Sequence, residues 1–229
     1  MPAPARLLVY SDLHCPYAYL AAYRLRKVLP EFRGRVEVVH KSLAIEYVDA
    51  KSTPKPILDQ ETGLILLEEP DIPYLPWHRP DSEWPVTFWP AFEAVKCAER
   101  QGLDKAHELD WLIREAFFAG SRCVSMRHVL LELAEHAGLD MRRFTEDFDS
   151  GAAKRLVLEE SREGWEALDI PVSPTFILPG GKRYVNPAAP KVHLDEDKHW
   201  KVTGVDPAPV RGKEALDLYR RMLEETRSG

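Results

Sequence analysis

Ser-Asp-Leu-His-Cys-Pro-Tyr-Ala-Tyr-Leu, residues 11–20, is the stretch that decides the fold of this chain. It follows the apolar run at 7–10 and opens an apolar segment that continues to Leu29. A continuous apolar run of this length is typical of a buried strand. Pro16 suits the first position of a helix, because its missing N–H would be unpaired there in any case. The stretch therefore predicts a strand-to-helix turn with the thiol of Cys15 at the start of the helix.

The position of Cys15 favours a reactive thiol over a small buried side chain. The N-terminus of a helix carries a partial positive charge, which stabilises thiolate over thiol. His14 is adjacent, and it either lowers the pKa of the thiol when protonated or is a solvated loop histidine. Three residues after Cys15, where a second cysteine would allow an internal disulfide, the chain has Ala18. A single thiolate can attack a disulfide or an electrophile, but it cannot close a disulfide within this turn.

The composition limits the class of protein. With 229 residues, 45% of them apolar, the chain can bury a full core as one large domain or as a domain with an insertion. Its 31 basic and 37 acidic residues give a net charge of −6 without a long basic cluster, which makes nucleic acid a poor partner. No segment reaches the roughly 20 apolar residues of a membrane helix. We therefore expect no membrane partner and a cytoplasmic location, which three widely spaced cysteines also fit.

The first two thirds of the chain divide into three segments with different predicted secondary structure. The apolar residues at 36–39 predict a second strand, which completes a β-α-β opening. Residues 51–90 contain eight prolines and three tryptophans, so helix is hard to sustain there. We expect this loop either to cover an apolar cleft or to be pinned to the core. From 91 to 168 apolar residues recur at helical spacing, with Ser125 and Asp140 as candidate caps.

The last third returns to strands. Residues 172–178 predict a strand, 183–185 its hairpin partner and 212–227 a terminal helix. This order is that of an α/β, thioredoxin-like fold with an inserted all-helical subdomain. We expect one domain over residues 1–229, whose thioredoxin-like part covers about 1–50 and 170–229 and whose helical insertion covers about 88–168.

Residues 11–20 resemble the Asp-x-x-Cys-Pro-Trp-Cys-Tyr segment of DsbA-like proteins in the thioredoxin superfamily, which include cytoplasmic relatives of the FrnE type. Residues 133–140 and 165–176 are similar to the last helices of that family and to its Val-Pro-Thr-Phe strand. The resemblance implies that Pro174 is cis and packs against the active cysteine. It also implies that Ser173, where many relatives have valine, offers backbone groups and a hydroxyl to an extended thiol-bearing substrate.

The redox cycle of that family uses the first cysteine as the nucleophile and the second to resolve the mixed disulfide. Ala18 leaves a single-cysteine route, in which an external thiol such as glutathione completes the exchange. Residues 15–21 are also similar to the Ser-Pro-Tyr-Ser-Tyr-Leu segment of 2-hydroxychromene-2-carboxylate isomerases and kappa-class glutathione transferases. In those enzymes a serine stabilises the glutathione thiolate, and Cys15 occupies its position here. A third interpretation is a non-catalytic thioredoxin-fold protein that binds thiol-bearing or extended ligands.

The candidate site therefore consists of Cys15 as the nucleophile and of His14, Tyr17, Ser173 and Pro174 as substrate-binding residues. We expect no tightly bound cofactor, with glutathione as a co-substrate. The expected partners are a thiol-bearing protein or small molecule, and a homodimer is left open.

The remaining candidate groups are interpreted as structural. Cys97 and Cys123 lie in helical or near-helical segments and are expected to pack in the fold, with a remote resolving role as the alternative. The run 193–199 holds possible metal donors, but its mixed charges predict a solvated loop. No metal site is expected.

Overall fold

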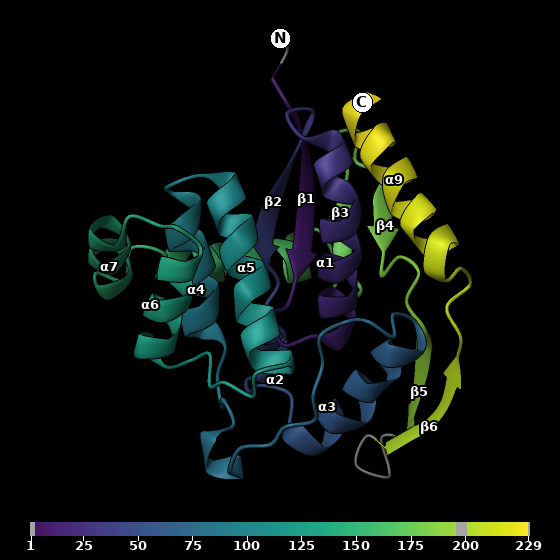
Figure 1. Ribbon diagram of the computed structural model, residues 1–229, viewed down its shortest axis with the longest axis horizontal. Helices are drawn as coiled ribbons and strands as arrows, with labels where there is room; N and C mark the ends of the chain where they lie inside the picture. The colour runs from purple at the N-terminus through teal and green to yellow at the C-terminus, as the bar shows by residue number, and fades with distance from the viewer. Residues whose placement is uncertain (1–2, 196–200, 229) are drawn as a thin grey trace.

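The structure is a computed structural model and describes residues 3–195 and 201–228. A four-stranded sheet in the order β2-β1-β3-β4 lies at its centre (Figure 1). β1 (Ala5–Ser11) is parallel to β2 (Val36–Ser42) and antiparallel to β3 (Thr175–Ile177), which pairs in turn with β4 (Arg183–Val185) in antiparallel fashion. This mixed sheet confirms the predicted α/β class.

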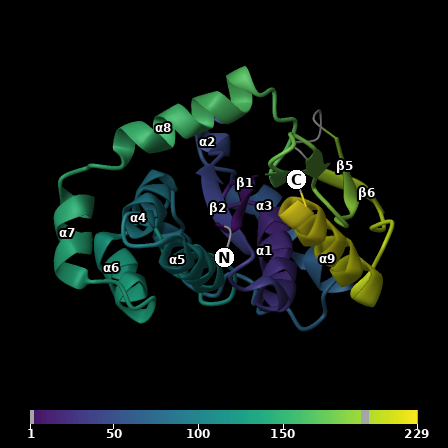
Figure 2. The same cartoon turned by 90° about the horizontal axis from the view of Figure 1, so that it is seen from above.

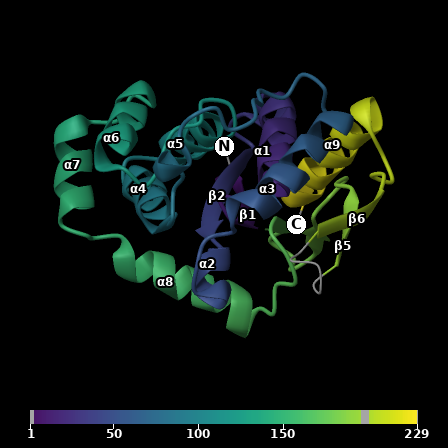
Figure 3. The same ribbon diagram turned by 90° about the horizontal axis from the view of Figure 1, so that it is seen from below.

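The described helices are α1 (Pro16–Val28), α2 (Ile45–Asp49), α3 (Lys55–Thr62), α4 (Trp89–Glu99), α5 (Leu103–Phe118), α6 (Arg127–His136), α7 (Met141–Asp149), α8 (Lys154–Arg162) and α9 (Gly212–Ser228). α1 and α9 lie side by side on one face of the sheet, as the view from above shows (Figure 2). α4 to α7 form a separate block beside the sheet, and α5 packs along β2 (Figures 2 and 3).

β1 is buried on both faces, which explains its continuous apolar run. Leu7 and Val9 pack in the cluster that includes residues of α1 and α9, whereas Tyr10 packs on the opposite face. There the π-helical turn that follows α8 approaches the sheet at Gly164. A Cβ at this glycine would lie 2.5 Å from Leu43 Cδ1, so the close approach requires a residue without a side chain.

The proline-rich segment is more ordered than the sequence indicates. Its first part forms α3, followed by a 3-10 turn at Gly63–Leu67, and a second 3-10 turn lies at Asp81–Glu83. The expectation of a helix-free segment was wrong here because Pro56 lies in the first turn of α3, where proline is tolerated. Residues 68–80 have neither helix nor strand.

One helix cap is confirmed and one is wrong. Asp140 accepts a hydrogen bond from the backbone N–H of Arg143 at the start of α7, at 3.1 Å. α6 begins at Arg127 without a side-chain cap, and the hydroxyl of Ser125 lies 3.2 Å from Cys123 Sγ instead. The cap failed because the helix begins one residue later than the apolar stripe suggests, with Met126 at the N-cap position.

A two-stranded hairpin that the sequence did not indicate follows the sheet. β5 (Lys191–Asp195) and β6 (Lys201–Asp206) pair in antiparallel fashion near α3, where Gln60 Oε1 accepts the N–H of Val202 at 3.2 Å. The predicted solvated loop at 193–199 thus begins within a strand, and its residues 196–199 lie outside the described residues. Across the described ranges, no helix is long and apolar enough to cross a membrane.

Candidate functional site

Cys15 is the residue that begins the first helix. Its backbone is extended, with φ −80° and ψ 121°, and its carbonyl accepts the N–H of Tyr19 at 3.0 Å. Pro16 follows at the first helical position. The strand-to-helix turn predicted from the sequence is confirmed, with the thiol at the N-terminal end of α1.

The segment before β3 meets this thiol. Cys15 Sγ donates to the backbone carbonyl of Ser173 at 3.4 Å, and the Ser173–Pro174 peptide bond is cis. The hydroxyl of Ser173 accepts the backbone N–H of Asp12 at 2.8 Å. The hydroxyl thus joins two loops of the protein, and a substrate contact through Ser173 stays a prediction. The structure does bring Cys15, Ser173 and Pro174 together.

Asp12 organises the turn, and the sequence analysis missed it. One of its carboxylate oxygens accepts the N–H of His14 at 2.5 Å, and the other accepts the N–H of Ile45 at 2.7 Å. Burial raises the pKa of Asp12 to about 6, although these two N–H groups lower it. An aspartate directly after a buried strand is a common turn former, which is the signal that would have found it.

α5 holds the same turn from the other side through a buried arginine. Arg114 Nη1 donates to the carbonyl of Asp12, and its Nη2 donates to the hydroxyl of Ser11, both at 2.9 Å. The guanidinium also makes two hydrogen bonds to Asp110, at 2.8 and 3.1 Å. Burial alone would raise the pKa of Asp110, but the charge of Arg114 brings it down to about 2. An aspartate four residues before an arginine on a helix with a buried face is the sequence signal for this pair.

Further buried polar side chains lie next to Asp110, between β2 and the helices packed on it. His40 lies 3.4 Å from Asp110 and 3.0 Å from His107, and burial lowers the pKa of both histidines. Lys96 forms an ion pair with Glu160 at 3.0 Å, and both side chains are almost fully buried. Apart from His40 Nδ1, which lies near Asp110 without a hydrogen bond, the buried groups named on this side of the turn have partners.

The thiol itself is closed off, contrary to the prediction of a lowered pKa. Cys15 is 7% exposed, and burial raises its pKa to about 12. The backbone N–H of Ala18 lowers the pKa, whereas the negative charges of Asp12 and Glu61 raise it. The helix end acts as expected, but in this closed arrangement desolvation outweighs it.

His14 fits neither of the two interpretations given above. It is 3% exposed, stacks on Phe88 with ring centroids 4.1 Å apart and meets the edge of Phe117 at 5.1 Å. Burial lowers the pKa of His14 to about 3, so the ring is neutral and supplies no charge to the thiolate. Its Nε2 has no hydrogen-bond partner among the described residues. A substrate-binding role for His14 stays a prediction.

Tyr17 and Glu61 face the thiol region from its second side. α3 lies across the N-terminal end of α1, as Figures 1 and 3 show. Glu61, in the last turn of α3, is half-buried, and burial raises its pKa to about 7. Its charge acts on both Cys15 and Tyr17, and the buried hydroxyl of Tyr17 has no partner within the described part of the chain. Nothing in the sequence pointed to Glu61, because only the packing of α3 brings it here.

Comparisons with known proteins agree with this architecture. The family described as Thioredoxin matches residues 78–185, a range that includes Pro174 but not Cys15. The cytosolic disulfide reductase DsbM of Pseudomonas aeruginosa is 21% identical, covering 96% of this chain and 97% of that chain, with a TM-score of 0.69. The chain has the DsbA-like thioredoxin fold. This confirms the predicted fold class and the resemblance stated from the sequence.

Two further proteins are similar to parts of the chain. The ClpXP adapter protein SpxH of Halalkalibacterium halodurans is 33% identical over 86 residues, which are 37% of this chain and 28% of that relative. The chain thus spans little more than a quarter of this curated relative. A solved 2-hydroxychromene-2-carboxylate isomerase is 17% identical, covering 79% of this chain and 88% of that chain, with a TM-score of 0.54. At this identity the likeness shows the shared fold.

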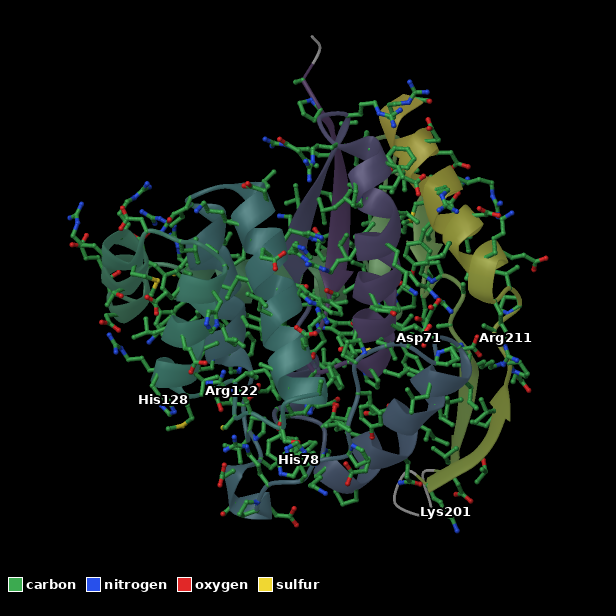
Figure 4. All side chains as sticks on the ribbon, viewed as in Figure 1. Asp71, His78, Arg122, His128, Lys201 and Arg211 are labelled. Atoms are coloured by element: carbon green, nitrogen blue, oxygen red, sulfur yellow. The ribbon has the colours of Figure 1, made fainter. Side chains whose placement is uncertain are left out.

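Within the DsbA-like thioredoxin fold, Ala18 stands where the second cysteine was expected. Ala18 is 2% exposed and lines a small cavity of about 10 Å³ together with Pro174. All three cysteines are free. Cys97 is fully buried in α4, and Cys123 is half-buried beside Arg122, which Figure 4 places near the end of the helical block.

Proposed function

We propose that the protein carries out thiol-disulfide exchange through Cys15 alone, with an external thiol in place of a resolving cysteine. The observation that carries this proposal is the position of Cys15 Sγ, at the first turn of α1 and 3.4 Å from the Ser173 carbonyl. An extended peptide that pairs with the backbone before Pro174 would bring its sulfur to this thiol.

The reaction has two steps at Cys15, and both balance. The Cys15 thiolate attacks one sulfur of a substrate disulfide, the S–S bond breaks, and the other sulfur leaves as a thiolate that takes up a proton. An external thiolate then attacks the substrate sulfur of the mixed disulfide, which releases Cys15 as a thiolate and leaves the substrate joined to the external thiol. A second external thiolate attacks the external sulfur of that product in solution, so that in sum one substrate disulfide is reduced to two thiols and two external thiols are oxidised to one disulfide.

The closed thiol must be opened for this chemistry. A thiol with a pKa of about 12 is thiolate to only about one part in 10⁵ at pH 7. We infer that substrate docking displaces side chains on the α3 side, because α5 is fixed to the turn by Arg114. Once the sulfur is solvated, the helix end and the Ala18 N–H favour the thiolate.

The comparisons support the external thiol. DsbM is described as a cytosolic disulfide reductase, and a second structure of that protein contains GSH. We therefore propose glutathione as an external thiol and a cytoplasmic location for this chain. A thiol-bearing protein or small molecule as substrate, and one domain with a helical insertion, are proposals of the same kind.

Trapping of the mixed disulfide tests the proposal. A Cys123→Ser variant removes the half-buried thiol, and incubation with glutathione disulfide followed by peptide mapping reports on Cys15. We expect a glutathione adduct on Cys15 that an excess of reduced glutathione removes, and none when Cys15 is also replaced by serine. Failure of Cys15 to form the adduct at any pH between 7 and 9 would contradict the proposal.

A glutathione-dependent isomerase or transferase is the second candidate. It is favoured by the protonated Cys15 thiol, which donates a hydrogen bond as a serine hydroxyl does, and by Ala18, which leaves no resolving thiol. Binding of reduced glutathione without any exchange at Cys15 would support this candidate. Binding of extended peptides without either reaction would support a non-catalytic protein.

A further inference from the structure

We propose, on the basis of the proposed exchange reaction, that Glu61 makes the Cys15 site selective for disulfides with a cationic group beside the exchanging sulfur. The matching chemistry is an aminothiol disulfide, or a cysteine next to lysine or arginine in a peptide. The same carboxylate disfavours disulfides whose groups beside the sulfur are anionic.

Within the described ranges the half-buried carboxylate of Glu61 has no hydrogen bond or ion pair, and burial alone raises its pKa. Two fully buried acids have cationic partners: Asp110 pairs with Arg114, and Glu160 pairs with Lys96. The basic side chains of Arg122 and Arg211, both labelled in Figure 4, form ion pairs with Glu132 and Glu68 instead of with Glu61. A partly desolvated carboxylate is stabilised by a positive charge, so a cationic substrate group gains where a neutral one does not.

The charged side chains with the largest effect on the thiol are both acidic. They are Asp12 and Glu61. Asp12 is held by two backbone N–H groups, and Arg114 behind it is held by Asp110. Asp12 is thus fixed inside the turn, and Glu61 is the acid left to meet the substrate.

Three neighbours of the turn, His14, Tyr17 and Ser173, bring no charge to it. His14 is neutral in its aromatic surroundings, and Ser173 presents a carbonyl. The hydroxyl of Tyr17 is buried without a partner and shares the field of Glu61, which raises the pKa of Tyr17. It is therefore a hydrogen-bond group for the same substrate region.

The size of the effect follows from Coulomb's law. A unit charge about 6 Å from the carboxylate, in surroundings between the protein surface and water, changes a rate or affinity about tenfold. Since the pKa of Glu61 is about 7, the preference is expected to grow as the pH rises through 7 and to fade in acid.

Three small disulfides test this selectivity: cystamine, which is cationic, bis(2-hydroxyethyl) disulfide, which is neutral, and 3,3′-dithiodipropionate, which is anionic. Rates of adduct formation on Cys15 are measured at pH 8 in the Cys123→Ser variant. Each rate is divided by the rate of the same disulfide with 2-mercaptoethanol, which removes intrinsic reactivity. We expect about a tenfold preference for cystamine over the neutral disulfide, and a further disadvantage for the anion.

The Glu61→Gln variant is expected to lose this order, because cystamine loses the attraction of the carboxylate and the anionic disulfide loses its repulsion. Glu61→Lys is expected to reverse the order. Asp59→Asn is the control, because it removes an exposed charge of the same helix, one that pairs with Lys55. It is expected to keep the order of the three rates.

Equal normalised rates in the parent protein, or an unchanged order in Glu61→Gln, would overturn the inference but leave the exchange reaction standing. An absence of adduct with all three disulfides would instead overturn the proposed function.

Discussion

The two sides of the Cys15 turn are built differently. On the α5 side, the polar atoms of Arg114 are all committed to Asp110, Ser11 and Asp12. On the α3 side, Glu61 and the Tyr17 hydroxyl lie close to the thiol without partners in the described ranges. Leaving a buried polar group unpaired costs about 1–3 kcal/mol, which a fold tolerates where a ligand can satisfy it. The difference assigns positioning of the thiol to α5 and access of the substrate to α3.

Removal of the α5 anchor is expected to have the largest effect on stability. Arg114→Ala leaves Asp110 charged and buried without its partner, which costs about 3–5 kcal/mol. Chemical denaturation monitored by circular dichroism measures the loss. Arg127→Ala, which removes an exposed ion pair with Asp149, is the matched control and is expected to leave the denaturation midpoint unchanged. Equal effects of the two variants would show that the α5 side does not carry the turn.

Restoring the second cysteine is expected to have the largest effect on the chemistry. Ala18→Cys places a thiol one helical turn after Cys15, so an internal disulfide resolves the mixed species. The steady-state amount of Cys15 mixed disulfide is expected to fall about tenfold. Peptide mapping without reduction measures both species. Persistence of the mixed disulfide at its original level would indicate that Ala18 is not in the resolving position.

The pH dependence of stability is expected to report on His14. Its folded-state pKa of about 3 lies below the ordinary value of 6.5, so the unfolded chain binds more protons between these limits. This contribution to stability is complete above pH 6.5 and is lost as the pH falls toward 3, by about 1.4 kcal/mol for each pH unit. His14→Phe keeps the ring in the aromatic cluster and is expected to have a shallower slope in that range. Parallel pH profiles for the two proteins would place the histidine in contact with solvent.

Glu61, on the α3 side, is expected to change stability with pH in the opposite direction to His14 and by a smaller amount. The folded-state pKa of Glu61 is raised to about 7, so its favourable contribution is complete below 4.5 and is lost as the pH rises through 7. Glu61→Gln is therefore expected to be more stable than the parent at pH 8 by up to about 3 kcal/mol, and equal to it at pH 4. Thermal unfolding at the two pH values measures the difference. Destabilisation at pH 8 would mean that the carboxylate has a partner.

The sequence predicts the parts of this comparison that are local in the chain. The apolar run before Cys15, together with Pro16 after it, specifies the strand-to-helix turn. A second apolar run, at 172–178, likewise predicts β3. α3 was missed because Pro56 resembles a helix breaker unless the helix start is known. A prediction made from one segment does not include the contacts that fix where a helix begins.

The electrostatics of the site depend on tertiary packing. The charge at a helix end can be inferred from the turn alone, and its direction was correct for the Ala18 N–H. The desolvation that reverses the net pKa shift of Cys15 comes from surrounding segments that are distant in sequence. For the same reason Asp110 and Arg114 have the appearance of an ordinary surface pair until α5 is seen to face the sheet.

Turnover with glutathione tests the central claim most directly. Reduction of bis(2-hydroxyethyl) disulfide by reduced glutathione is measured with the parent protein, with Cys123→Ser and with Cys15→Ser. The account predicts turnover above the uncatalysed rate in the first two proteins and its complete loss in Cys15→Ser. Equal turnover in Cys15→Ser, or none in the parent protein, would contradict exchange through Cys15.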